Sequence, residues 1–84
     1  MYYSIEAAEL IIESNGDKVS GGTVIWENAK TEKEAKKIGN KLIKNNNVWS
    51  VWIHKWENEQ QNDDPLYQWR KYKSDKEWFG TSGC

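Results

Sequence analysis

Hydrophobic residues are densest in residues 48–56, a run that holds three of the six tryptophans. Its Val, Ile and Trp content favours a β-strand, whose side chains point alternately to the two faces of a sheet. Both faces of this strand are apolar, whereas a strand with one solvated face is apolar on one side only. We therefore expect both faces to be covered. One face would carry Trp49, Val51 and Ile53, and the other Val48, Ser50, Trp52, His54 and Trp56.

Residues 2–14 fit two structures. Their good helix formers allow a helix that ends before Asn15-Gly16. Residues 14–17, however, form a turn signal between two apolar runs, which is typical of a β-hairpin. We prefer the hairpin, with a bulge at Ala7-Ala8. Its second strand would cover residues 18–28, where Gly21 and Gly22 indicate a further bulge or the close approach of another backbone or a ligand.

Residues 31–34 have the sequence Thr-Glu-Lys-Glu, a capping box that predicts the start of a helix. Apolar residues then recur at helical spacing on one stripe, and lysines occupy the remainder. Gly39 lies on the apolar stripe and permits close approach to a bulky surface, which we expect to be the tryptophans of the sheet. Asparagines at 45–47 predict the end of the helix. The apolar stripe consists of Ala35, Ile38 and Leu42, with Ile43 as a further candidate.

Residues 57–65 are polar, end in a proline and predict a solvent-exposed loop. Residues 66–73 would carry Tyr67 and Trp69 on one face and Leu66 and Tyr72 on the other. They predict a final strand that returns antiparallel to the tryptophan-rich one. In the remaining segment Trp78 and Phe79 would be costly to leave in water. We therefore expect them to dock on this chain or on a partner.

These elements predict a single α+β domain in residues 1–79 and a flexible tail in residues 80–84. The order is ββαββ, in which one helix packs on an antiparallel four-stranded sheet as a two-layer sandwich. The helix should cover the face of Trp49, Val51 and Ile53, because that face is the more uniformly apolar. The opposite face would then be bare, and we expect it to bind a partner or ligand.

Composition narrows the class of protein. The 84 residues carry a net charge of −1, and Arg70 is the one arginine among twelve basic residues. This balance argues against a duplex-DNA binder and against a DNA mimic. The one cysteine, Cys84, permits no disulfide within the chain, and no signal peptide or long apolar span is present. We expect a cytoplasmic protein that does not enter a membrane.

Catalytic and metal-binding groups are scarce. General-base or nucleophilic catalysis usually needs a histidine or an activated thiol held by neighbouring groups, and the chain offers only His54 and Cys84. One histidine and one cysteine do not complete a zinc site. No glycine-rich phosphate motif precedes the helix. We therefore predict a non-enzymatic protein with no catalytic residue, metal or cofactor.

The aromatic residues are the unusual resource of this sequence, although half or more of them would serve simply as core. Tryptophan, tyrosine and arginine are enriched at protein interfaces, which favours a protein partner and allows a homodimer. The alternative is that aromatic rings stack on single-stranded nucleic acid or a nucleotide, with Lys55, Arg70, Lys71 and Lys73 near the phosphates. The predicted binding residues are Trp52, His54, Trp56, Tyr67, Trp69, Arg70, Lys71 and Trp78.

The helix start at residues 31–35, the strand that begins Val48-Trp49-Ser50-Val51 and the Lys/Asn-rich composition resemble small accessory proteins of bacteriophages of Gram-positive bacteria. That group includes inhibitors of host defence. The resemblance covers roughly residues 18–57 and transfers no functional residue. It implies a protein that acts in the host cytoplasm by stoichiometric binding, either occluding a host protein or sequestering a small ligand.

Overall fold

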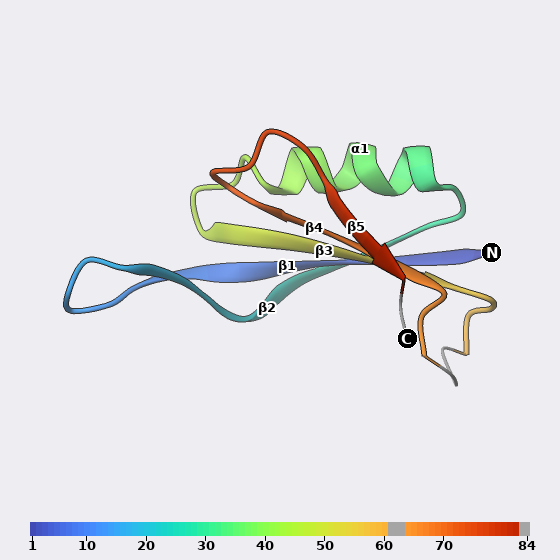
Figure 1. Ribbon diagram of the computed structural model, residues 1–84, viewed down its shortest axis with the longest axis horizontal. Helices are drawn as coiled ribbons and strands as arrows, with labels where there is room; N and C mark the ends of the chain where they lie inside the picture. Colours follow the sequence, from blue (N-terminus) through green and yellow to red (C-terminus); the bar gives the residue numbers. More distant parts are fainter. Residues whose placement is uncertain (61–63, 83–84) are drawn as a thin grey trace.

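A computed structural model of the protein describes residues 1–60 and 64–82, and in it one helix lies on an antiparallel sheet (Figure 1). The prediction of an α+β fold with the helix on one side of the sheet is confirmed. The predicted number of strands is wrong, since five rather than four are found in the described residues, in the order β2-β1-β3-β4-β5. The elements are β1 (Tyr2–Ile12), β2 (Lys18–Ala29), α1 (Glu32–Leu42), β3 (Val48–Trp56), β4 (Tyr67–Tyr72) and β5 (Phe79–Ser82).

Strand β5 occupies a segment that we expected to begin a tail. It pairs with β4, and Gly80 lies opposite Trp69. A Cβ atom at Gly80 would lie 2.7 Å from the Tyr67 ring and 3.0 Å from the Trp69 ring. Gly80 thus allows an edge strand to lie close to two aromatic side chains. Of the expected tail, Gly83 and Cys84 lie outside the described residues.

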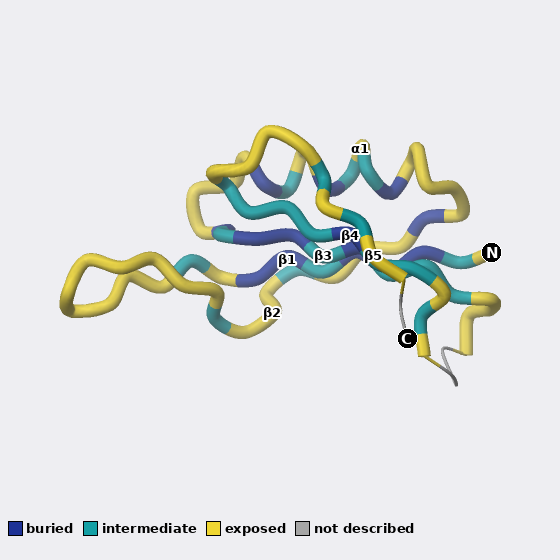
Figure 2. Tube along the Cα trace, in the orientation of Figure 1, coloured by how far each residue is buried: buried dark blue, intermediate teal, exposed yellow. Residues whose placement is uncertain are grey.

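The N-terminal segment forms the β1–β2 hairpin and not a helix. β1 pairs with β2 on one edge and with β3 on the other, so its middle residues are buried. The register shifts beside Ala7 and Ala8, where we expected a bulge. Beyond this point the hairpin projects past α1, and its surface there is exposed (Figures 1 and 2). Gly21 lies in this arm against Ile11, whose Cδ1 would be 2.6 Å from an added Cβ.

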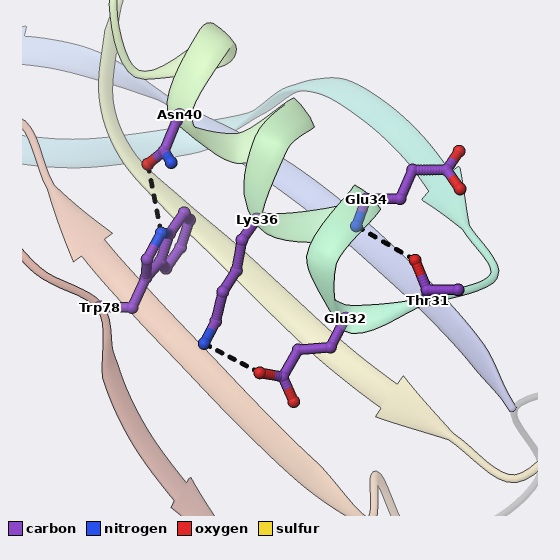
Figure 3. Close-up of polar contacts among 6 residues, drawn as sticks. All are labelled: Thr31, Glu32, Glu34, Lys36, Asn40 and Trp78. Carbon is purple, nitrogen blue, oxygen red and sulfur yellow. Dashed lines mark hydrogen bonds and ion pairs between the residues drawn. The ribbon is translucent and has the colours of Figure 1, made fainter.

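The helix begins at the predicted cap. The Thr31 hydroxyl accepts a hydrogen bond of 3.1 Å from the backbone N–H of Glu34, and Glu32 and Lys36 form an ion pair one turn apart (Figure 3). Ala35 and Gly39 are the buried residues of α1, which packs on β1 and β3. In the described part of the chain no helix has the length and apolarity needed to cross a membrane.

The prediction for the two faces of β3 is correct for Val51 and Ile53 and wrong for Trp49. Val51 and Ile53 are fully buried in the core beneath α1. The register between β1 and β3, however, pairs Ala8 with Ser50 and Glu9 with Val48, so that it skips Trp49. This bulge reverses the alternation. Val48 therefore enters the core, and the Trp49 ring lies against Tyr72 and beneath the ammonium group of Lys18.

Candidate binding face

The side of the sheet opposite α1 is here called the open face, because in the described ranges no helix packs on it (Figure 1). β2 reaches over one end of this face, where the Ser20 and Ser50 hydroxyls form a 2.7 Å hydrogen bond. Residues directly opposite each other on paired strands share a face. Glu6 lies opposite Trp26 and Trp52, and Arg70 lies opposite Trp52 and Phe79. These five residues form one row, which we call the cross-sheet row, with one residue from each strand. Its order is Trp26, Glu6, Trp52, Arg70 and Phe79.

Arg70 is held by aromatic rings. Its guanidinium carbon lies 5.0 Å from the ring centroids of Tyr72 and Phe79 and 5.7 Å from that of Trp52. Contacts of this kind attract the cation to the ring faces. The Nε atom is buried and has no hydrogen-bond partner among the described residues. The rings therefore fix a cation near the middle of the open face without neutralising it.

The neighbouring row contains His54, which lies opposite Ser4 and Gln68. Its ring lies 5.9 Å from that of Trp56, and the Trp56 indole N–H donates a 2.8 Å hydrogen bond to the Ser4 hydroxyl. The Nδ1 atom of His54 is buried and unpartnered within the described ranges. Trp52, His54, Trp56 and Arg70, four of the eight predicted site residues, thus lie together on the open face.

Tyr67 and Trp69 lie on the helix side, although we expected them to share a surface with Trp52. Trp69 pairs with Ile53 across the β3–β4 ladder and is only 8% exposed, so it belongs to the core. The centroid of the Tyr67 ring lies 4.8 Å from that of the Trp69 ring. The ammonium of Lys36 in α1 lies 5.4 Å from the Trp69 ring centroid. The pairing register explains the difference, because a shift of one residue exchanges the two faces of a strand.

Lys71 and Trp78 also lie on the helix side, where they attach the β4–β5 connection to α1. The Trp78 indole N–H donates to the Asn40 side-chain oxygen at 3.2 Å (Figure 3). The Lys71 ammonium donates to the same oxygen at 3.1 Å and lies over the Trp78 ring. A Cβ atom at Gly39 would lie 2.6 Å from this ring. The bulky group that Gly39 accommodates is therefore Trp78 of the connection, in addition to Val51 of the sheet.

Four residues that form part of the candidate site on the open face were absent from the predicted site: Glu6, Trp26, Tyr72 and Phe79. Trp26 is 64% exposed and Phe79 is 56% exposed, so they are the most accessible rings of the cross-sheet row. The pairing of β2 with β1 is irregular, so the alternation of residues along β2 did not predict which face of the sheet carries Trp26. Phe79 could have been found from its apolar character, had the short strand β5 been recognised.

Charge is distributed unequally between the two sides. Lys55 and Lys71 lie opposite helix-side residues on the neighbouring strands, and Lys73 donates to the backbone oxygen of Asn45 after α1. On the open face the cations of the described residues are Arg70 and Lys18, whose ammonium lies over Trp49. The accessible aromatic rings and most of the lysines are thus on opposite sides of the sheet.

A separate hollow lies at the end of the molecule that carries Met1. Its lining is mainly polar and includes three carboxylates, those of Glu34, Glu57 and Glu59, with Lys30 beside them. None of the predicted site residues lines this hollow. It offers neither a histidine nor a thiol for catalysis, and we therefore place the candidate site on the open face.

No protein-family model, curated protein or solved structure matches the chain. No residue role is therefore transferred from a relative. The candidate site is defined by geometry, as the cross-sheet row together with His54, Trp56 and Tyr72.

Proposed function

We propose that this protein is a small non-enzymatic binding protein whose open face binds another protein and occludes that protein's surface. The supporting observation is the cross-sheet row, in which exposed aromatic rings flank Trp52 and the ring-bound guanidinium of Arg70. Centres of protein interfaces are enriched in aromatic residues and arginine, and a few such residues carry most of the binding energy. The row has this composition.

The two most exposed rings of the row supply a substantial driving force. Trp26 is 64% exposed and Phe79 is 56% exposed. Aromatic side chains bury 150–250 Å² when fully covered, so a partner would remove roughly 100 Å² of apolar surface from water at each. At about 25 cal/mol per Å², each ring contributes about 2–3 kcal/mol to binding. Association also costs the two molecules translational and rotational freedom. These two rings alone therefore do not suffice for stable binding, and the rest of the open face must contribute.

The alternative, binding of single-stranded nucleic acid or a nucleotide, has the same rings in its favour. Such binding combines stacked aromatic side chains with a positively charged groove that follows the phosphates. Here most lysines lie on the helix side, and the cross-sheet row contains an acidic residue, Glu6, in addition to Arg70. This distribution of charge favours a protein partner over a polyanion.

The activity that we propose is binding itself. His54 is on the open face, but its neighbours Ser4, Gln68 and Trp56 do not form a proton-transfer pair with it. A stoichiometric inhibitor needs only to cover a surface of its target. This mode of action agrees with the one implied by the resemblance to bacteriophage accessory proteins.

The proposal is tested by comparing partner capture by two matched variants of the full chain. The face variant, Trp26→Ser with Phe79→Ser, removes the two exposed rings of the row. The control variant, Val19→Ser with Leu66→Ser, removes two other exposed apolar side chains, which are 36% and 45% exposed. Mass spectrometry measures which proteins co-purify in stoichiometric amount from the native cell. We expect the control to retain the partner and the face variant to lose it.

Retention of the same partner by the face variant would refute the proposed function. Nucleic-acid binding is measured separately, by titrating tryptophan fluorescence with oligonucleotides and nucleotides at two salt concentrations. Quenching that weakens steeply with salt would support strand binding in place of a protein partner. Quenching by a nucleotide with little salt dependence would support nucleotide sequestration. We expect neither.

A further inference from the structure

We infer, on the basis of the proposed function, that the open face binds a second copy of this chain in a two-fold symmetric dimer. The cross-sheet row carries opposite charges on the two sides of its central residue. Glu6 lies on one side of Trp52 and Arg70 on the other. The outer positions are both aromatic, Trp26 beyond Glu6 and Phe79 beyond Arg70. The row is therefore complementary to itself when reversed.

A two-fold axis can perform this reversal. Let the axis run parallel to β3, above Trp52, midway between two facing sheets. Rotation about it turns the second sheet over and exchanges its left and right sides, so Glu6 of one copy faces Arg70 of the other. The contact occurs twice, as in any interface in which both subunits use the same patch. Trp52 then meets its own counterpart, and Trp26 meets Phe79.

The dimensions of paired sheets allow these contacts. Neighbouring strands lie about 4.8 Å apart, and sheets that pack face to face lie about 10 Å apart. Glutamate and arginine side chains on facing sheets together span that gap. The same rotation keeps the strands of the two copies nearly aligned, which is one of the two common arrangements of packed sheets.

In the described residues neither Glu6 nor Arg70 forms an ion pair. The ion pair found among residues 1–60 and 64–82 joins Lys36 and Glu32 on α1, away from the open face. Arg70 is positioned by three rings, and its Nε has no acceptor in that part of the chain. An arginine that is already held in place loses little freedom when it meets a carboxylate.

Charge reversal gives a test that depends on the symmetry. Glu6→Arg and Arg70→Glu are purified separately, and the mass of each is measured by sedimentation and native mass spectrometry, alone and mixed. We expect the wild-type chain to be a dimer. Each variant alone places like charges together twice and should dimerise at least about 100-fold more weakly. The mixture should form a dimer with one copy of each variant, because both contacts then join opposite charges.

Two further sets of variants complete the test. Glu57→Arg and Lys37→Glu make the same changes of charge at exposed positions away from the row, and both should remain dimers. Glu6→Gln and Arg70→Gln remove charge without introducing repulsion, which tests the inference even if a reversed charge prevents folding. We expect each to weaken the dimer by roughly 10-fold, since each change removes both ion pairs.

A wild-type chain that is monomeric at about 100 μM would overturn the inference. Reversal variants that remain dimers, or fail to combine when mixed, would also overturn it. None of these results would refute the proposed function, which is decided by the capture of a different protein by the Trp26 and Phe79 variant. If both hold, the second copy and the foreign partner compete for one face.

Discussion

Replacing Gly39 with alanine should reduce stability, although alanine is the better helix former. Glycine inside a helix costs about 1 kcal/mol relative to alanine. At this position, however, the new Cβ would lie 2.6 and 2.7 Å from two carbons of the Trp78 ring and 3.3 Å from Val51 Cγ1. The ring must move, and it is held by the hydrogen bond to Asn40 and by the ammonium of Lys71.

The magnitude follows from these opposing effects. Overpacking of a close contact costs typically 1–3 kcal/mol, or about 2 kcal/mol here. Loss of the indole hydrogen bond adds about 0.5–1 kcal/mol, at the low end because the bond is exposed. After the gain in helix propensity of about 1 kcal/mol is subtracted, we expect Gly39→Ala to lower the free energy of unfolding by about 1–2 kcal/mol.

The sign should reverse when Trp78 is removed. In a Trp78→Ala background the added Cβ meets only Val51, at a distance that a small shift relieves. Gly39→Ala should then stabilise the protein by about 0.5–1 kcal/mol. Urea unfolding followed by far-UV circular dichroism measures all four proteins of the cycle and does not depend on tryptophan emission. Stabilisation of the wild type by Gly39→Ala, or additivity of the two changes within about 0.5 kcal/mol, would refute the proposed packing.

Two other predictions concern elements that position the open face. Trp69→Ala should lower the free energy of unfolding by about 3–5 kcal/mol because Trp69 is buried under α1, whereas Trp26→Ala on the exposed face should change it by no more than about 0.5 kcal/mol. Equal effects in chemical denaturation would contradict the assignment of the two faces. Thr31→Ala should cost about 1 kcal/mol because it removes the acceptor for the N–H of Glu34, while Thr31→Ser should retain most of the stability. An unchanged unfolding midpoint for Thr31→Ala would show that the cap does not contribute.

The sequence predicted those parts of the fold that depend on local chemistry. The Thr31 cap, the turn after β1 and the alternation of Val51 and Ile53 all involve residues close together in the chain, and the structure contains each of them. The bulge at Ala7 and Ala8 was found for the same reason. Local patterns also placed Trp52, His54 and Trp56 on one face, because a single strand contains all three.

Pairing between distant strands could not be predicted in this way. The side of the sheet on which Trp69 lies depends on its register against Ile53, and no local signal fixes that register. The bulge that turns Trp49 away from the core is likewise a property of the β1–β3 pair. Strand β5 is short and contains Gly80, which lowers its strand propensity, so its pairing with β4 determines its structure.

The position of β1 between β2 and β3 also affects how the chain can fold. β1 is made first, and its partner on one edge, β2, follows at once, whereas its partner on the other edge, β3, lies beyond α1. During synthesis on the ribosome, the edge of β1 that pairs with β3 therefore stays unpaired until β3 has been made. Unpaired strand edges are sites of aggregation. α1 emerges before β3 and can shield the apolar side of the hairpin during this interval. Closing the β1–β3 contact over this separation is a slow, nonlocal event, so we expect it to set the rate of folding.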